Sequence, residues 1–351
     1  MFDFEAIENK RRHRIKQLID LCHRHVAEYT VISTNPLIFF VPIDLNLSHF
    51  VRNYKFLFDS LNDRKVFIVC NTWWHYEEEW NIDELSRLLN RFKTEYPKYQ
   101  FIFLCNTLRQ KEKFDERKFR SVFCSSNCFV DERLFFPVAN VKKEVDAVYD
   151  GRLVEWKRHN LAAELESLGL IYYAIPWLED NSYMKQLISD FHHAKFFNHT
   201  EDGEYRKLSP SQINQVLNRC RVGLCLSAEE GANYASIQYL LAGLPVVTTP
   251  NVGGRNEFLD KDNSITVEPD PESVRRGVEQ MISRDPSPTA IRGKVLERMQ
   301  THRDRFISLI QNIYDEEGAD RDFSIEWRSI FFNRFLKNRN HLETIQFLAA
   351  Q

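Results

Sequence analysis

Glycine is missing from the first 150 residues of this 351-residue chain, and all 11 glycines lie from Gly151 onward. A Rossmann dinucleotide-binding unit needs a glycine-rich turn after its first strand, and a P-loop needs glycines that let the backbone approach phosphate. The N-terminal half therefore contains neither motif. This absence argues against an NAD- or FAD-dependent oxidoreductase and places any phosphate-binding site after residue 150.

An excess of charge of one sign and long apolar runs are also lacking. The 47 Lys and Arg residues nearly balance the 50 Asp and Glu residues, so no overall field favours nucleic acid. No stretch reaches the roughly 18 apolar residues of a membrane span, and the N-terminal MFDFEAIENKRRHR lacks the apolar core of a secretion signal. We expect a cytoplasmic protein that binds no nucleic acid.

A basic run near the N-terminus, from Lys10 to Lys16, has two interpretations. It can be the solvated face of a helix expected over residues 1–28. It can also be a patch that contacts the inner face of a membrane peripherally, close to a lipid-linked substrate.

The cysteines provide no metal site. All seven are scattered, and most lie in apolar runs, so we expect reduced core thiols. Cys124 and Cys128 form the closest pair, but no second Cys/His pair at ligand spacing accompanies them. The Asp260-Lys261-Asp262 sequence is not a convincing Asp-x-Asp metal motif at a strand end. We therefore expect neither a metal nor another cofactor.

What the chain does contain is the pattern of an α/β protein. Hydrophobic residues make up 43% of the sequence, and the length suggests two domains. Short apolar runs alternate with helical stretches, which is typical of parallel sheets. The first series of runs covers 31–42, 65–72, 99–107 and 120–126, and the second covers 145–151, 171–175, 195–199, 221–227, 245–249 and 264–269.

Residues typical of helix ends lie between these runs. Asn81 with Glu84, and Ser209 with Gln212, predict capping boxes that open helices. Asp270-Pro271 predicts another helix start, whereas Gly169 and Gly243 stand where helices are expected to end.

The segment 226–271 carries the strongest functional signal. It reads as a strand, a loop, a helix starting near Ala232, a buried strand and a second loop. In open α/β sheets ligands bind beyond the carboxyl ends of the strands, so both loops are expected at one site. A helix N-terminus there favours an anion, and a diphosphate suits it.

Motif residues in this segment stand at fixed spacings: Ser227, Glu230-Gly231, Ala242-Gly243, Pro245-Val246-Val247, and Gly253-Gly254 with Glu257. This pattern resembles the retaining glycosyltransferases of the GT-B fold, group 1/family 4. That family has a second acid eight positions after the first, whereas this chain has Gln238.

Two neighbouring segments extend the resemblance over residues 120–285. YDGRLVEWKRHNLA (149–162) is similar to the strand-loop-helix that opens the family's donor domain, with Arg152 and Lys157 where a diphosphate-binding pair is expected. SNCFVDERLFFP (126–137) is similar to the stretch that ends the family's first domain, with Cys128 replacing a glycine.

The resemblance implies two Rossmann-like domains that face each other across a cleft. Residues 1–140 would form the acceptor-side domain, 141–310 the donor domain, and 311–351 helices that pack back towards the first domain. The implied reaction is the retaining, metal-independent transfer of a hexosyl group from a nucleotide-diphosphate sugar, UDP- or GDP-linked. The implied acceptor is a glycan or lipid-linked glycan in surface polysaccharide synthesis.

The resemblance also implies roles for individual residues. Glu230 would bind hydroxyls of the donor sugar, Gln238 would face the ribose, and Arg152 with Lys157 would bind the diphosphate. His75 would lie near the donor sugar, although a packed histidine is the alternative interpretation. The remaining donor-site residues are Ser227, Gly231, Ala232, Asn233, Tyr234, Gly253 and Gly254.

Two other functions stay open. A nucleotide- or glycan-binding relative that lost catalysis is favoured by Gln238 and disfavoured by the presence of Arg152, Lys157 and Glu230. A nucleotide-sugar epimerase of the same fold would need further acid/base residues in the donor half, where the sequence has no such cluster.

Overall fold

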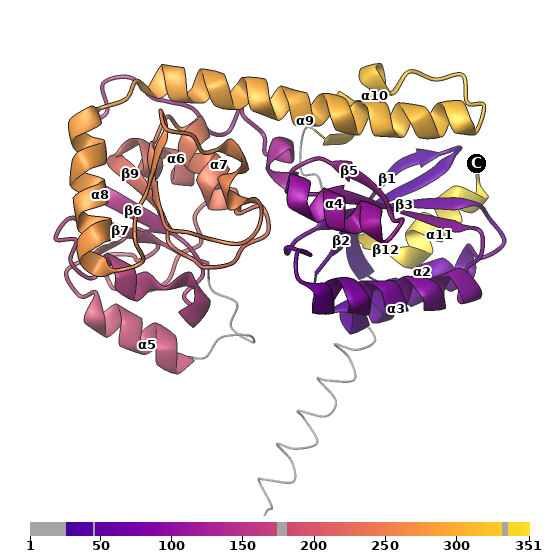
Figure 1. Ribbon diagram of the computed structural model, residues 1–351, viewed down its shortest axis with the longest axis horizontal. Helices are drawn as coiled ribbons and strands as arrows, with labels where there is room; N and C mark the ends of the chain where they lie inside the picture. The colour runs from indigo at the N-terminus through magenta and orange to yellow at the C-terminus, as the bar shows by residue number, and fades with distance from the viewer. Residues whose placement is uncertain (1–25, 45, 174–180, 332–335) are drawn as a thin grey trace, which may run out of the picture. The chain divides into compact units, whose positions relative to one another are not determined.

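The computed structural model describes residues 26–44, 46–173, 181–331 and 336–351. They form two compact units, shown in Figure 1. Unit 1 combines Met1–Phe123 with Arg305–Gln351, and unit 2 comprises Cys124–Asp304. The chain passes from unit 2 back into unit 1 within the long helix α9 (Pro288–Glu316). Among the described residues, no helix combines the length and the apolar character needed to cross a membrane.

Unit 1 is built on a six-stranded sheet of order β12-β1-β2-β3-β4-β5. The pairs from β2 to β5 are parallel, whereas β1 is antiparallel to both of its neighbours. The strands are β1 (Val26–Thr34), β2 (Leu37–Ile43), β3 (Val66–Thr72), β4 (Tyr99–Cys105), β5 (Arg120–Phe123) and β12 (Lys337–Asn340).

Helices cover both faces of this sheet. On one face, Phe39 and Ile68 belong to an apolar cluster that also contains Phe50 of α2 (Leu47–Ser60) and Phe92 of α3 (Glu79–Glu95). On the other face, Phe40 packs edge-on against Phe306 of α9, with ring centroids 6.1 Å apart. The helices of this unit are α2 (Leu47–Ser60), α3 (Glu79–Glu95), α4 (Leu108–Glu116), α10 (Phe323–Phe331), α11 (His341–Ala349) and the end of α9.

Three expectations for unit 1 are wrong. The run 31–42 is not one strand but part of a hairpin of β1 and β2, and residues 26–28, expected to be helical, belong to β1. Burial alternates over Val26–Tyr29, as it does in a strand with one face on the core, and Tyr29 is fully buried against Phe39. The rest of the expected N-terminal helix, including the basic run, lies outside the described residues. The tail expected to be helical also contains a strand, β12.

The capping box at Asn81 is also wrong. Helix α3 begins earlier, at Glu79, and Asn81 is buried inside it. The side-chain amide of Asn81 instead donates to the His75 carbonyl oxygen at 3.2 Å. Its side chain thus fixes the loop that precedes the helix.

Unit 2 is built on a second six-stranded sheet, of order β11-β10-β9-β6-β7-β8. All pairs of named strands in this sheet are parallel. The strands are β6 (Val145–Asp150), β7 (Leu168–Ile171), β8 (Lys195–Phe196), β9 (Cys220–Cys225), β10 (Val246–Thr248) and β11 (Ser264–Thr266).

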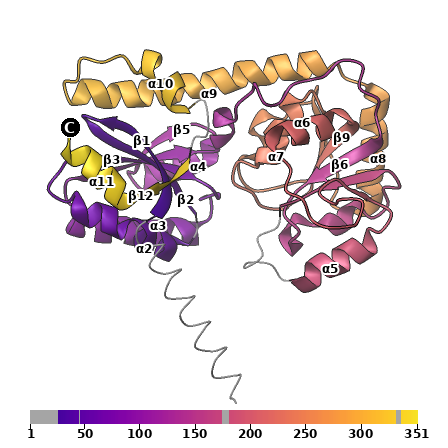
Figure 2. The same ribbon diagram turned by 180° about the vertical axis from the view of Figure 1, so that it is seen from behind.

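Helices lie on both faces of this sheet too, as Figure 2 shows from behind. Val278 of α8 and Leu187 of α5 share an apolar cluster with Val222 and Leu224 of β9. On the opposite face, the α7 residue Tyr239 packs against Gly223. The helices are α5 (Asn181–Asp190), α6 (Pro210–Asn218), α7 (Tyr234–Leu241), α8 (Pro271–Arg284) and the short 3-10 turns η1 (Ser126–Phe129), η2 (Glu155–Lys157), η3 (His159–Ala162) and η4 (Gly254–Phe258).

The capping residues of unit 2 are largely confirmed. Ser209 and Gln212 form a reciprocal capping box at α6, Asp270 caps α8, and Gly243 follows α7 with a left-handed φ of 77°. Gly169 is a correction, because it lies inside β7. A Cβ there would stand 2.5 Å from the Phe197 ring, so close packing and not a helix end explains this glycine.

The helix expected after β6 is a second correction. Two 3-10 turns, η2 and η3, stand in its place. Arg158 between them is left-handed, with φ 53° and ψ 47°, and a residue in this conformation interrupts a right-handed helix.

The unit boundaries differ from the expected ones at 140 and 310. The segment after Phe123 groups with unit 2 because its polar groups bond there. The Asn127 amide donates to the Ala232 carbonyl oxygen at 2.7 Å, and the Arg303 guanidinium donates to the Cys128 carbonyl oxygen at 2.7 Å. The Ser125 amide donates to the His302 ring at 3.2 Å.

Candidate donor-binding site

The order of strands in unit 2 marks one position at the sheet's carboxyl edge. From β6 the chain proceeds to β7 and β8 on one side, and later from β9 to β10 and β11 on the other. In open α/β sheets, ligands bind where the strand order reverses in this way. The loops that follow β6 and β9 carry Arg152, Lys157, Ser227 and Glu230.

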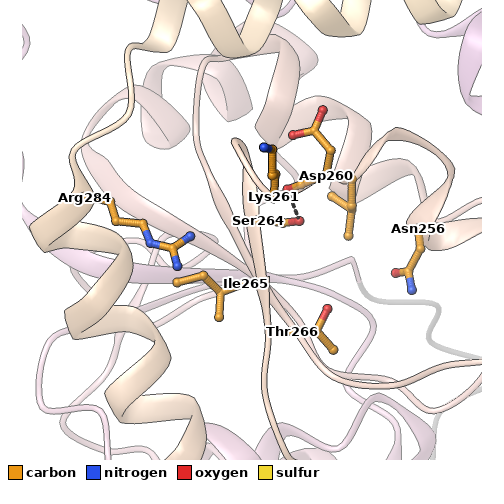
Figure 3. Close-up of a pocket in the computed structure, with 8 residues that line it drawn as sticks. Asn256, Asp260, Lys261, Ser264, Ile265, Thr266 and Arg284 are labelled. Atoms are coloured by element: carbon orange, nitrogen blue, oxygen red, sulfur yellow. Dashed lines mark hydrogen bonds between the residues drawn. The ribbon is translucent and has the colours of Figure 1, made fainter.

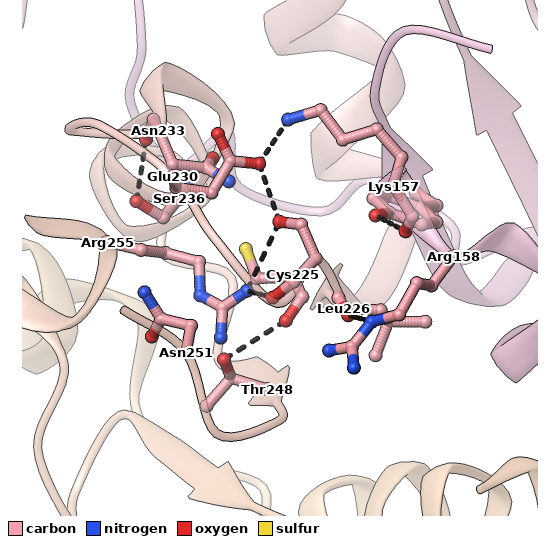
Figure 4. Close-up of polar contacts among 12 residues, drawn as sticks. Lys157, Arg158, Cys225, Leu226, Glu230, Asn233, Ser236, Thr248, Asn251 and Arg255 are labelled. Atoms are coloured by element: carbon pink, nitrogen blue, oxygen red, sulfur yellow. Dashed lines mark hydrogen bonds and ion pairs between the residues drawn. The ribbon is translucent and has the colours of Figure 1, made fainter. Parts of the chain in front are cut away.

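An ion pair joins these two loops. The Lys157 ammonium contacts Oε1 of Glu230, and the two side chains are only 16% and 8% exposed. Figure 4 shows Lys157 extended towards this carboxylate. The Ser227 hydroxyl donates to the same oxygen at 2.6 Å. Three of the predicted residues therefore meet at one carboxylate oxygen.

Arg152 lies on the loop after β6 with unused hydrogen-bonding capacity. Its guanidinium carbon is 5.9 Å from the centre of the Trp156 ring, a cation–π distance. Its Nε is buried and has no hydrogen-bond partner among the residues that the structure describes. A guanidinium in this state can donate to an anionic ligand.

Backbone hydrogen bonds hold the loops after β9 and β10 together. The Glu230 amide donates to the Val252 carbonyl oxygen at 3.0 Å, and the Gly254 amide donates to the Gly231 carbonyl oxygen at 2.7 Å. Gly253 has φ 105°, a backbone conformation that other residues rarely adopt. The predicted glycines thus shape the backbone next to Glu230.

Helix α7 starts immediately after this loop. Asn233 is its N-cap, left-handed with φ 58°, and its side chain accepts from the Ser236 amide at 3.1 Å. The Asn233 side chain is therefore committed to the cap. Ala232 is buried, Tyr234 is 45% exposed, and Gln238 is half-buried one turn further along.

Asp150 is a titratable group at this edge that sequence reasoning missed. It ends β6, and burial raises the pKa of its carboxyl to about 7, although the nearby Lys157 ammonium lowers it. Its backbone amide donates to the Tyr239 hydroxyl at 2.5 Å. The signal in the sequence was an acid directly before Gly151-Arg152 at a strand end.

Two arginines were also missed. Arg158 donates to the Leu226 carbonyl oxygen at 2.6 Å and to the Thr249 hydroxyl at 2.8 Å. Arg255, fully buried on η4, donates to the carbonyl oxygens of Ser227 and Thr249. Burial lowers the pKa of both guanidinium groups. No sequence spacing distinguished either arginine from a surface residue.

His75 lies in unit 1, apart in sequence from the other predicted residues. It follows β3 and is 3% exposed, and its ring centroid is 5.6 Å from that of Trp74. The packing expected of a core histidine is therefore present, and its place near a donor sugar stays a prediction.

In the described ranges, no group of three or more His, Cys, Asp or Glu side chains is arranged to hold a metal ion. Asp260 pairs with Arg298 at 2.9 Å, and Asp262 pairs with Lys294. The six described cysteines are buried, and the sulfur atoms of Cys124 and Cys128 lie 3.8 Å apart.

An open cavity of about 690 Å³ lies elsewhere in unit 2, beside the edge strand β11 (Figure 3). No predicted donor-binding residue lines it. Its lining includes Lys261, Arg284 and Asn256 together with β11 itself. The cavity is thus separate from the contacts around Glu230.

Comparison with solved structures shows which fold this is. A sucrose-phosphate synthase from Thermosynechococcus elongatus superposes with a TM-score of 0.51 at 15% identity, covering 77% of this chain and 78% of that one. Anabaena HepE in complex with UDP gives 0.51 at 16% identity, covering 80% and 78%. TarM gives 0.53 at 13% identity, covering 80% of this chain and 55% of its own.

These neighbours are glycosyltransferases of the GT-B type, and the two α/β units of this chain have that fold. The fold class expected from the sequence is therefore confirmed. No protein-family model and no curated protein sequence matches the chain.

Proposed function

We propose that this chain is a glycosyltransferase that binds a nucleotide-diphosphate sugar in unit 2 and transfers the hexosyl group to a glycan or lipid-linked glycan. The observation that carries the proposal is the meeting of Lys157, Ser227 and Glu230 where the strand order reverses. The GT-B fold and the UDP bound in the HepE structure support it.

In this proposal the diphosphate lies between Lys157, Arg152 and the start of α7. Arginine and lysine side chains form charge-assisted hydrogen bonds to phosphate oxygens. The helix dipole adds partial positive charge at the same place. Glu230 then binds hydroxyls of the donor sugar, and Gln238 binds the ribose through its amide.

The chemical step breaks the bond between the anomeric carbon and the diphosphate oxygen. Negative charge grows on the departing diphosphate, and fixed cations lower the barrier by stabilising it. We propose retention of the anomeric configuration, with the departing phosphate accepting the proton of the acceptor hydroxyl. No divalent metal takes part in this scheme.

Calorimetry with UDP, GDP, ADP and their sugars tests the donor site, with EDTA present throughout. One nucleotide series is expected to bind, and Lys157→Met is expected to weaken its affinity about 10- to 100-fold, since hydrogen bonds to charged groups contribute roughly 1.5–3 kcal/mol. Lys195→Met is the matched control, because Lys195 pairs with Glu144 at 2.6 Å on the surface of the same unit.

The outcomes separate the candidate functions. Failure of every nucleotide to bind the unaltered protein would overturn the donor site. Binding without release of nucleoside diphosphate in the presence of glycan acceptors would favour the binding relative that lost catalysis, which Gln238 also favours. NMR of the product's anomeric proton tests retention.

A further inference from the structure

Arg255 carries a charge in the interior of unit 2, and its described hydrogen-bond acceptors are all uncharged oxygens. Its side chain is fully buried. One terminal nitrogen donates to the Ser227 carbonyl oxygen at 2.5 Å and to the Ser227 hydroxyl at 3.3 Å, and the other donates to the Thr249 carbonyl oxygen. Within the described ranges no carboxylate lies at ion-pair distance from this guanidinium.

Such an arrangement costs free energy. A buried cation loses its hydration, and neutral carbonyl oxygens compensate less than a carboxylate does. The desolvation also lowers the pKa of the Arg255 guanidinium. A methionine of similar size would fill the same space without this cost. We therefore expect the charge of Arg255 to have a role besides packing.

The contacts of Ser227 indicate what this role of Arg255 is. Its hydroxyl oxygen lies 3.3 Å from the Arg255 guanidinium and donates its own proton to Oε1 of Glu230 at 2.6 Å. A hydroxyl that accepts from a cation is polarised and becomes a stronger donor. Arg255 thereby orients this proton towards Glu230.

Glu230 is left with one committed oxygen and one available oxygen. Lys157 and Ser227 both contact Oε1, and no described group donates a hydrogen bond to Oε2. A carboxylate fixed through one oxygen presents the other in a set direction, as recognition of sugar hydroxyls requires.

We propose that Arg255 is a positioning residue that fixes the Glu230 carboxylate for the donor sugar through the hydroxyl of Ser227. The inference rests on the proposed donor site and adds a specificity determinant to it. Arg255 itself touches no donor atom, because its side chain is fully buried.

Arg158 provides the matched control. It also donates to the ends of β9 and β10, at the Leu226 carbonyl oxygen and the Thr249 hydroxyl. In the part of the chain that the structure describes, it makes no hydrogen bond to Ser227 or Glu230. Both arginines therefore tie the same strand ends together, and only Arg255 acts on the carboxylate through Ser227.

The test compares UDP with UDP-glucose by calorimetry, with GDP/GDP-mannose and ADP/ADP-glucose as parallel pairs. The nucleotide and nucleotide-sugar that bind the unaltered protein are then titrated into four variants: Arg255→Met, Ser227→Ala, Arg158→Met and Glu230→Gln. Arg255→Met and Ser227→Ala are expected to weaken nucleotide-sugar binding about 10- to 100-fold and to change nucleotide binding less than about threefold. Their sugar-to-nucleotide affinity ratio should approach that of Glu230→Gln, whereas Arg158→Met should leave the ratio unchanged.

A purely structural role gives a different result. Equal weakening of nucleotide and nucleotide-sugar by Arg255→Met overturns the inference, and so does an unchanged ratio in Ser227→Ala. If Arg255→Met does not fold, Ser227→Ala decides alone. Absence of binding of every pair to the unaltered protein overturns the donor site itself, and with it this inference, before any variant is made.

Discussion

Asp150 sits at the end of β6 with a pKa raised to about 7 by burial, close to the Lys157 that is proposed to bind diphosphate. Below pH 7 its carboxyl is neutral, and above pH 7 it adds a negative charge beside the bound phosphates. We therefore expect affinity for UDP-glucose to fall as the pH rises from about 6 to about 8. Calorimetry at pH 6, 7 and 8 checks this, and Asp150→Asn should remove the dependence.

The same residue links pH to stability. Its folded pKa of about 7 exceeds the ordinary value of 3.8, so the folded protein binds the proton more tightly than the unfolded chain does. The contribution to stability is present below about pH 4 and is lost as the pH rises towards 7. Urea unfolding of Asp150→Asn should lack this loss, and an identical pH profile for both proteins would contradict the assignment.

Gln238 is the position where the chain departs from the two-acid spacing of the glycosyltransferase pattern. A carboxylate accepts a ribose hydroxyl proton more strongly than an amide oxygen does. Gln238→Glu is therefore expected to tighten UDP binding about threefold to tenfold, roughly 1 kcal/mol. Inorganic pyrophosphate, which lacks ribose, is the control ligand and should bind both proteins equally. Weaker UDP binding by the variant would place Gln238 away from the ribose.

At the scale of elements, the packing of α7 on β9 depends on a missing side chain. A Cβ on Gly223 would stand 2.3 Å from Cδ2 of the buried Tyr239 ring. Gly223→Ala is expected to lower the free energy of unfolding by about 1–3 kcal/mol, as overpacking does. Because the Tyr239 hydroxyl accepts from the Asp150 amide, nucleotide binding should weaken too.

Urea unfolding measures the first effect, with Gly293→Ala as the control. Gly293 lies within α9, and nothing lies within 4 Å of the position that a Cβ would take there. Alanine there should be neutral or stabilising by up to about 1 kcal/mol, because alanine favours helix more than glycine does. Equal losses in the two variants would show that Tyr239 can move aside.

Prediction from the sequence succeeded where the signal was local. The capping box at Ser209 and most strands of unit 2 follow from short-range chemistry, although β7 (Leu168–Ile171) begins three residues before the run expected over 171–175. The motif spacing placed Ser227 and Glu230 in one loop, where their side chains are hydrogen-bonded. Prediction failed where the structure depends on contacts between residues that are far apart in the sequence. The pairing of β12 with β1 and the place of Gly169 depend on residues far away in the chain. Arg255 was missed for the same reason, because burial of a charged side chain leaves no periodic pattern.

At the scale of the whole molecule, every predicted donor-binding residue belongs to unit 2, whereas His75 belongs to unit 1. Hydrogen exchange with UDP should therefore slow at residues 151–158, 226–233 and 250–254 and leave unit 1 unchanged, since a ligand stabilises the regions it binds. Replacing UDP with the sugar nucleotide tests His75, because added protection at residues 71–80 is expected if it meets the sugar. Protection confined to unit 1 would contradict the donor site.

The discontinuous make-up of unit 1 has a consequence for biosynthesis. A ribosome that has translated as far as Asp304 has already delivered every strand of unit 2, while the sheet of unit 1 still lacks β12. The sheet of unit 1, whose first strands are translated before unit 2, is thus completed after unit 2. A nonsense mutation just before Lys337 would release a chain that contains all of unit 2, in which the residues Val26–Tyr29 have lost the strand that pairs with them.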